Sequence, residues 1–295
     1  MPRQQLQGLI AGFLAYAMWG LFPLFFNLLR DVPSIEVLLH RVIWSFVFVG
    51  LIILGLGQKS RFLQVFNHRA LLLGLLMTSL LVSFNWLVYI WTVAQGRVLE
   101  ASLGYFLTPL VSVFLARVFL REALDPVRWL AILLAAGGIL WLVVNLGTFP
   151  WVSLSLALSF GLYGLLRKQL EVDPLTGLAV ETVLLLPIAL AYAFYLGYNE
   201  AGHFISAGRS VSLLLMACGV VTAVPLLFFA AAAKKLSLSA IGFMMYINPS
   251  LQFVVAIYLL DEAFKRDQLV GFVFIWAALM VFTVGSIRLE LKHSP

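Results

Sequence analysis

Two ionisable side chains, His40 and Arg41, stand together at the start of an almost unbroken apolar run from Val42 to Leu54. In a lipid-embedded helix, a central charge costs about 2.5 to 3.5 kcal/mol on insertion scales, and such residues are usually functional. Histidine titrates near neutral pH and can carry a proton. Arginine keeps its proton and binds a carboxylate or another anionic group. We interpret His40 as a candidate proton carrier and Arg41 as a candidate substrate clamp.

A second interpretation of this pair is structural. His40 and Arg41 lie about a turn and a half into their helix, where long side chains can extend to the membrane surface at lower cost. The pair would then be an interfacial anchor beside Glu36. Helical spacing also places Glu36, His40 and Trp44 on one stripe, which adds Trp44 to the candidate substrate-binding residues.

The stretch "SFNWLVYIWTVAQGR" offers a polar and aromatic helix face. Asn85 and Tyr89 are four residues apart, and Trp86 lies three residues before Tyr89. Aromatic walls with a few hydrogen-bonding groups suit an organic solute. We predict that these three residues line a binding pocket, and the alternative is that they pack helices together.

Two prolines, Pro109 in "GYFLTPL" and Pro249 in "MMYINPS", interrupt two other apolar runs. Proline removes one helical hydrogen bond and frees the carbonyl four residues earlier. A matched pair of broken helices is typical of a transport pathway. We therefore predict hinges at these prolines, with a purely structural kink as the alternative. The nearby candidate substrate-binding residues are Tyr105, Tyr246, Asn248 and Gln252.

The elements that position these residues are predicted to be membrane-spanning helices. The 295-residue chain is 63% hydrophobic and 11% charged, against about 25% charged in ordinary soluble domains. A soluble core could not bury so much apolar surface. Strand-like alternation is missing from the sequence, so the spans are predicted to be helices. The ten predicted spans are 8–29, 35–56, 70–92, 98–120, 126–144, 151–166, 175–196, 211–233, 238–260 and 268–287, of which the sixth is the shortest.

The two halves of the sequence resemble each other. "LTPLVSVFLARVFLREALD" from Leu107 matches "INPSLQFVVAIYLLDEAFK" from Ile247, and each proline precedes a Glu-Ala pair, at Glu122 and Glu262, by thirteen residues. Each half would contain five crossings, so the second half would be inserted upside down. We predict an all-α membrane protein with ten transmembrane helices in two inverted five-helix repeats, residues 1–147 and 148–295.

The repeat adds one more ionisable candidate. At a shift of 141 residues, His40 corresponds to Glu181 and Arg41 to Thr182. Glu181 is also isolated in an apolar run, so we predict that it is a second proton carrier. The alternative is a partly exposed carboxylate near the inner end of its helix.

The charge distribution predicts topology. The net charge is +6, and with the N-terminus inside, thirteen of the nineteen Lys and Arg residues fall on the cytoplasmic side. The positive-inside rule then places both termini in the cytoplasm, and nothing indicates a nucleic-acid partner. The first apolar run is too long for a cleaved signal peptide and is expected to remain as a span.

Enzyme signatures are missing from the sequence. It contains no zinc-protease, nucleophile-elbow or nucleotide-binding motif, and the single cysteine, Cys218, excludes an internal disulfide. We expect no enzyme activity, no metal and no cofactor. An intramembrane enzyme that uses Glu36, His40 and Glu181 is the weaker alternative.

The strings "LLHRVIWS", "NWLVYIWTVAQGRVLEASLGYFLTPL" and "YINPSLQFVVAIYLLDEAF" resemble the RarD-type branch of the EamA transporters, in the drug/metabolite transporter (DMT) superfamily. The resemblance covers essentially the whole chain. It implies a permease or exporter of the bacterial inner membrane with alternating access and a central cavity between its halves. We expect a small-molecule substrate, amino-acid-like or a drug, and no obligate protein partner. Proton-coupled transport and an uncoupled, channel-like facilitator both remain open.

Overall fold

The computed structural model describes residues 3–119, 121, 124–146, 149–233, 235–236, 241 and 244–293. Within these residues the regular elements are all helices. The helices are α1 (Arg3–Gly20), α2 (Phe22–Asn27), α3 (Ser34–Gly55), α4 (Lys59–Val65), α5 (Arg69–Ala94), α6 (Val98–Phe119), α7 (Pro126–Leu146), α8 (Trp151–Gln169), α9 (Pro174–Tyr198), α10 (His203–Ser206), α11 (Arg209–Ala233), α13 (Ile247–Tyr258) and α14 (Arg266–His293).

Eight helical segments in the described part of the chain are long and apolar enough to cross a membrane. The first of them, Gln4–Asn27, combines α1 and α2. The predicted sixth span is the helix α8, but its serines and its terminal Arg167 and Lys168 make it less apolar than the eight. The predicted ninth span overlaps α13, which has 12 residues. Residues 238–240 and 242–243 of that predicted span lie outside the described residues, as do Glu122 and Ala123 of the repeated motif.

Local signals in the sequence set several helix boundaries. Asp173 caps α9: its carboxylate accepts a hydrogen bond from the Thr176 amide at 3.0 Å, and Pro174 follows at the first helical position. Gly96 has a φ of +64° immediately after α5. This left-handed conformation favours glycine and ends the helix there.

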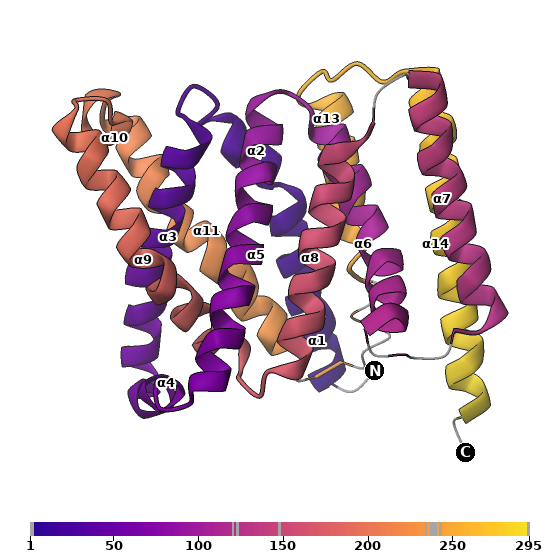
Figure 1. Ribbon diagram of the computed structural model, residues 1–295, viewed down its shortest axis with the longest axis horizontal. Coiled ribbons are helices and arrows are strands. Elements are labelled where there is room, and N and C mark those ends of the chain that lie inside the picture. The colour runs from indigo at the N-terminus through magenta and orange to yellow at the C-terminus, as the bar shows by residue number, and fades with distance from the viewer. Residues whose placement is uncertain are drawn as a thin grey trace.

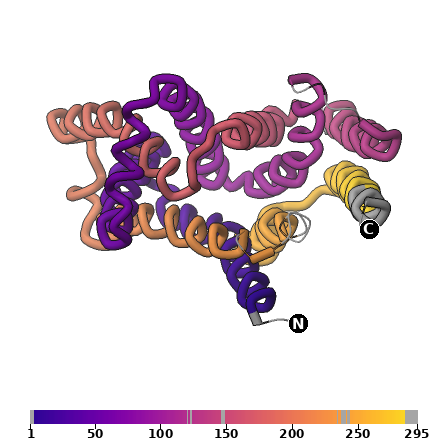
Figure 2. The backbone as a smooth tube through the Cα atoms, turned by 90° about the horizontal axis from the view of Figure 1, so that it is seen from below, coloured from indigo at the N-terminus to yellow at the C-terminus, as the bar shows by residue number. Residues whose placement is uncertain are grey.

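Most of the closest helix packing joins the N-terminal half of the chain to the C-terminal half. α3 packs on α11 and α9, α5 packs on α8 and α9, and α6 packs on α8 and α13. α1 lies against α11 and α13, and α7 lies against α14 (Figure 1). Seen along the helices, the segments form one elongated layered body in which the two halves interleave (Figure 2). Neither half could therefore bury its apolar faces without the other.

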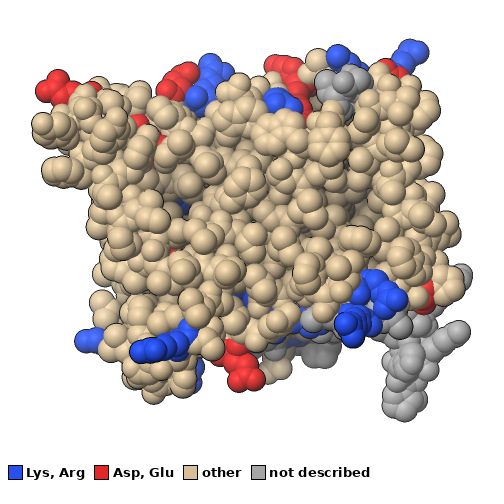
Figure 3. All heavy atoms as spheres, viewed as in Figure 1, with Lys and Arg blue, Asp and Glu red and all other residues tan. Residues whose placement is uncertain are grey.

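The start of α1 and the end of α14 lie on the same side of the molecule, the lower side in Figure 1. The short helices α4 and α10, which follow α3 and α9, lie on opposite sides. Lys, Arg, Asp and Glu gather along the upper and lower edges, and the face between them is a band of other residues (Figure 3). Such a band is what a chain needs to face the hydrocarbon of a bilayer. The protein is a multi-pass membrane protein.

Candidate solute-binding site

Arg41 points into the helix bundle. Its side chain comes from α3 and is 4% exposed, so it does not extend to the membrane surface as an interfacial anchor would. Nε donates a hydrogen bond of 3.0 Å to the hydroxyl of Thr222 in α11. The guanidinium carbon lies 3.9 Å from the ring centre of Trp86, and 5.5 and 5.8 Å from those of Phe26 and Phe22. A cation over aromatic faces is stabilised by their quadrupoles.

Thr222 is well suited to hold this guanidinium. Its hydroxyl donates to the carbonyl of Cys218 at 2.8 Å, which leaves an oxygen lone pair for Arg41. The backbones of α3 and α11 also approach closely here, because a Cβ placed on Gly219 would overlap the carbonyl group of Trp44. A glycine at this position is therefore what allows the two helices to meet beside Arg41.

The predicted stripe of Glu36, His40 and Trp44 faces α10. Glu36 is 1% exposed, and its two oxygens contact the amide and ring Nδ1 of His203 at 2.6 and 2.8 Å. His40 stacks on Phe204 with ring centres 4.7 Å apart, and Trp44 lies 6.1 Å from the same ring. Glu36 therefore pairs with His203, and it is not the hydrogen-bond partner of His40 or Arg41.

Asn85, predicted to line a pocket with Trp86 and Tyr89, joins three helices. Its amide nitrogen donates to the carbonyl of Leu156 and the hydroxyl of Ser159 in α8, at 3.1 and 2.9 Å. Its oxygen accepts from the hydroxyl of Tyr105 in α6 at 3.3 Å. These contacts favour the packing alternative for Asn85, while they orient Tyr105 toward Tyr89, whose ring centre is 5.7 Å away.

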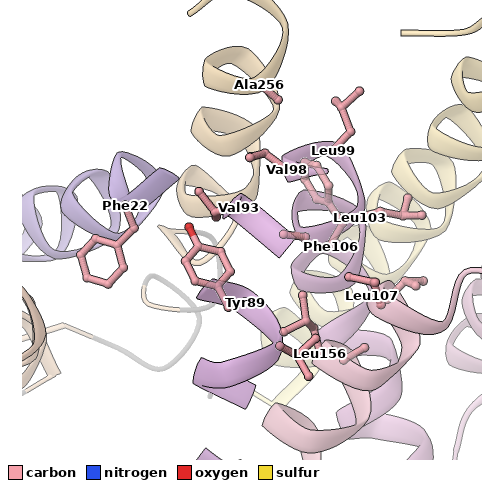
Figure 4. Close-up of a cluster of buried hydrophobic side chains, with 14 of the residues drawn as sticks. Phe22, Tyr89, Val93, Val98, Leu99, Leu103, Phe106, Leu107, Leu156 and Ala256 are labelled. Carbon is pink, nitrogen blue, oxygen red and sulfur yellow. The ribbon is translucent and has the colours of Figure 1, made fainter. Parts of the chain in front are cut away.

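Tyr89 continues the aromatic lining that begins at Arg41. Its ring centre lies 5.9 Å from that of Phe26, and Figure 4 shows it on the side of α5 that faces Phe22. On the other side, Phe106 and Leu156 fill the contacts among α5, α6 and α8 (Figure 4). Trp86, Phe22 and Phe26 thus place rings from α2 and α5 around one buried cation. Tyr89 extends this lining through its contact with Phe26.

Glu181 lies in a cluster of its own. It is 1% exposed on α9, and one oxygen accepts from the hydroxyl of Thr78 at 2.6 Å and lies 3.8 Å from Nε of Arg167. The other oxygen accepts from the hydroxyl of Tyr163 at 3.4 Å. The structure gives Glu181 and His40 separate partners, so the two predicted proton carriers do not form a hydrogen-bonded pair.

The two predicted hinge prolines differ in position. Pro109 lies inside the continuous helix α6, whereas Pro249 is the third residue of α13. The hydroxyl of Ser102 donates to the Pro249 carbonyl at 2.9 Å and ties the two helices together. Gln252 donates to the side-chain oxygen of Asn248 at 2.7 Å.

Tyr246 lies apart from Arg41, at a cavity of about 280 Å³ between α6 and α14. A second cavity, of about 170 Å³, lies between α3, α4 and α9. Arg41 lines neither of them. Its side chain is instead packed inside the bundle, where it is 4% exposed.

Several buried polar atoms in this part of the bundle have no hydrogen-bond partner among the described residues. They include His40 Nδ1, Trp44 Nε1, the hydroxyl of Tyr89 and Oε1 of Gln252. Buried polar groups are normally hydrogen-bonded, because leaving one unsatisfied costs about 1 to 3 kcal/mol. Four of the predicted site residues thus retain polar atoms that are free for a ligand.

Sequence reasoning missed the partners of the two buried charges. Thr222 is 181 positions from Arg41, and Thr78 is 103 positions from Glu181. Arg167 and Tyr163 stand four residues apart, so they share a face of α8 that a search for i, i+4 pairs would find. The pairing of that face with Glu181 has no such local signal.

Comparison with known proteins identifies the family of the chain. The EamA-like transporter family matches the chain twice, over residues 6–144 and 150–284. The chain belongs to this family. Over 292 residues it is 40% identical to Protein RarD of Escherichia coli (strain K12), covering 99% of each chain. It is 43% identical to an uncharacterized transporter of Vibrio cholerae serotype O1, covering 96% of this chain and 93% of the relative.

A solved crystal structure shares the fold of this EamA-like transporter. It is 17% identical, covers 96% of this chain and 98% of its own, and aligns with a TM-score of 0.60. The family and the relatives together identify the chain as a RarD-type membrane transporter of the DMT superfamily and not an enzyme. A small-molecule substrate and a lipid bilayer as its surroundings fit this class.

Proposed function

We propose that the protein is a secondary transporter that exports small organic metabolites, amino-acid-like solutes or drugs, across the bacterial inner membrane by alternating access. The observation that carries this proposal is Arg41, a buried cation among aromatic rings with no ion-pair partner in the described chain. Such a residue binds an anionic group of a solute. His40, Trp44, Trp86, Tyr89 and the hydroxyl of Tyr105 would complete its surroundings.

The proposed architecture is ten transmembrane helices in two inverted five-helix repeats, residues 1–147 and 148–295. The most extensive helix contacts support this arrangement, because they remain the same set when each helix is exchanged for its counterpart in the other half. The contact of α3 with α11 becomes that of α9 with α5, and α1 with α13 becomes α8 with α6. The contacts of α3 with α9, α6 with α13 and α7 with α14 each map onto themselves.

The proposed orientation places both termini in the cytoplasm. The common side of the α1 start and the α14 end supports an even number of crossings (Figure 1). The excess of Lys and Arg that the sequence assigns to that side supports a cytoplasmic location. Pro109 in α6 and Pro249 in α13, whose carbonyl accepts the Ser102 hydrogen bond, are proposed to let these helices bend during the transport cycle.

His40 and Glu181 are the proposed proton carriers. The ring nitrogen Nδ1 of His40 has no hydrogen-bond partner among the described residues, so it is proposed to bind a proton. The carboxyl group of Glu181 is proposed to alternate between a protonated form and an ionised form that pairs with Arg167. An inward-moving proton supplies about 2.3 kcal/mol per 100 mV, enough to drive export against a modest gradient. The alternative is an uncoupled facilitator, in which the same site operates without either proton.

The test is solute counterflow in proteoliposomes, with solutes chosen by a thermal-shift screen of metabolites and drugs. A secondary transporter is expected to show saturable counterflow of at least one solute that stabilises the fold. If no such solute exchanges across the membrane, the proposal is wrong.

In the same vesicles, a pH gradient is expected to change the rate for the wild type but not for His40→Ala or Glu181→Gln. If the protein is an uncoupled facilitator, the pH gradient will leave the counterflow rate unchanged in the wild type and in both variants.

A further inference from the structure

The guanidinium of Arg41 has unused hydrogen-bond donors. It carries five N–H groups, and the one on Nε is donated to Thr222. No described residue accepts a hydrogen bond from its two terminal nitrogens. These nitrogens form the fork that binds both oxygens of a carboxylate. A solute with a carboxylate would therefore satisfy donors that the protein leaves free.

The same site offers no counter-charge to an ammonium group. The two carboxylates buried in α3 and α9 are both engaged: Glu36 holds the amide and ring of His203, and Glu181 holds Thr78, Tyr163 and Arg167. An ammonium group near Arg41 would have to displace one of these sets of contacts. Without that displacement it would be buried and unpaired, which costs several kcal/mol.

The aromatic rings do not replace the missing carboxylate. One face of Trp86 is occupied by the guanidinium at 3.9 Å, so that face of the indole ring is already used. The rings of Phe22 and Phe26 also lie within 6 Å of the same cation. A second positive charge over these rings would lie close to Arg41 and be repelled by it. The rings suit an uncharged planar part of the solute instead.

We propose that the Arg41 site selects solutes that carry a carboxylate but no free ammonium group, such as N-acylated amino acids or aryl alkanoic acids. This inference rests on the proposed transport function and specifies its substrate class. It assigns Arg41 to the carboxylate and the neighbouring rings to an uncharged organic part. Within the class of amino-acid-like solutes, blocking or removing the amino group is expected to strengthen binding.

The experiment compares four probes that share an indole ring: indole-3-propionate, N-acetyl-L-tryptophan, L-tryptophan and tryptamine. Binding to the purified full-length protein is measured by titration, and transport by counterflow. The first two probes are expected to bind at least about tenfold more tightly than the last two, a factor equivalent to about 1.4 kcal/mol. Arg41→Lys keeps a charge but loses the planar fork, and is expected to abolish the preference. Arg30→Gln removes an exposed cation and is expected to leave it unchanged.

Equal or tighter binding of L-tryptophan by the wild type would overturn the inference, and so would a failure of all four probes to bind. Neither outcome depends on whether the Arg41 variant folds. In either case, saturable counterflow of another solute would still support the proposed transport function. Loss of counterflow for every solute in the wider screen would instead overturn that function.

Discussion

At the residue scale, the buried charges were predictable and their partners were not. Arg41 and Glu181 stand out because each interrupts an apolar run that must lie in lipid. Their hydrogen-bond partners, Thr222 and Thr78, come from helices far away in the sequence, and threonine is common in such helices. Asn85 was predicted to line a pocket, but its side-chain amide donates hydrogen bonds to α8 and so joins helices.

The Glu181–Arg167 pair is expected to stabilise the fold. Removing one partner of a buried ion pair typically costs about 3 to 5 kcal/mol. The cost here should be smaller, because the side chain of Arg167 is 14% exposed. Glu181→Gln and Arg167→Gln are each expected to lower the melting temperature. The double variant is expected to lose less unfolding free energy than the sum of the two single losses. Strict additivity in this double-mutant cycle would show that the two groups are not coupled.

Glu262 is expected to make stability depend on pH. It lies between α13 and α14, and its carboxylate accepts hydrogen bonds of 3.2 and 3.1 Å from the Leu99 amide in the first turn of α6. Burial raises the pKa of Glu262 from its ordinary value near 4.5 to about 7. The folded state therefore binds more protons than the unfolded state between these values. The contribution of Glu262 protonation to the free energy of unfolding is complete below about pH 4.5 and is lost as the pH rises through 7.

The measurement is the melting temperature of purified protein between pH 5 and pH 8. Glu262→Gln keeps an acceptor for the Leu99 amide and cannot ionise, so it is expected to reduce the fall in stability over this range. Glu262→Ala should lose the cap of α6 as well, at a cost of about 0.5 to 2 kcal/mol. An unchanged pH dependence in the Gln variant would show that another group titrates.

At the element scale, apolar length predicted the helices well. A span needs about 20 apolar residues, so long runs give clear segments. The exceptions are α8, whose serines lower its hydropathy, and α13, which is short. The serines have a structural use that the sequence does not reveal: the hydroxyl of Ser153 donates to the carbonyl of Glu100, and that of Ser159 accepts from Asn85.

The close approach of α3 and α11 is expected to depend on Gly219. A methyl group at this position would overlap the carbonyl oxygen of Trp44, so Gly219→Ala must push the helices apart. We expect a loss of about 1 to 3 kcal/mol in unfolding free energy and weaker solute binding, because Arg41 and Thr222 belong to these two helices. Thermal unfolding and ligand titration would measure the two effects.

Gly164 in α8 provides the matched control. A Cβ at that position meets nothing within 4 Å. Gly164→Ala is therefore expected to keep solute binding. It should also gain about 0.5 to 1 kcal/mol in unfolding free energy, because alanine loses less conformational entropy than glycine when a helix folds. Equal behaviour of the two variants would contradict the importance of the α3–α11 contact.

At the scale of the whole molecule, the membrane class followed from composition alone. The interleaving of the halves could not be predicted in this way, because apolar helix faces of similar composition can pair in many ways. The repeat in the sequence supplied the prediction of an inverted arrangement, through the match of Pro109 with Pro249 and of Glu122 with Glu262. The exchange symmetry of the helix contacts is the structural support for that prediction.

The inverted arrangement predicts opposite accessibility of α4 and the loop before α10. Cysteines introduced singly at exposed Lys59 and Glu200 would lie on opposite sides of the membrane. In spheroplasts, an impermeant maleimide is expected to label Glu200→Cys directly and Lys59→Cys only after permeabilisation. The native Cys218 is fully buried and should react little. Labelling of both introduced cysteines from the same side would rule out the inverted topology.

The central claim is that Arg41 recognises a transported solute, and counterflow in proteoliposomes tests it most directly. The wild type and Arg30→Gln, reconstituted at equal density, are expected to exchange the same solute at similar rates. Arg41→Gln, shown to be folded by its elution and melting profile, is expected to lose at least about tenfold in exchange at subsaturating solute. Undiminished exchange by the folded Arg41→Gln variant would contradict the account.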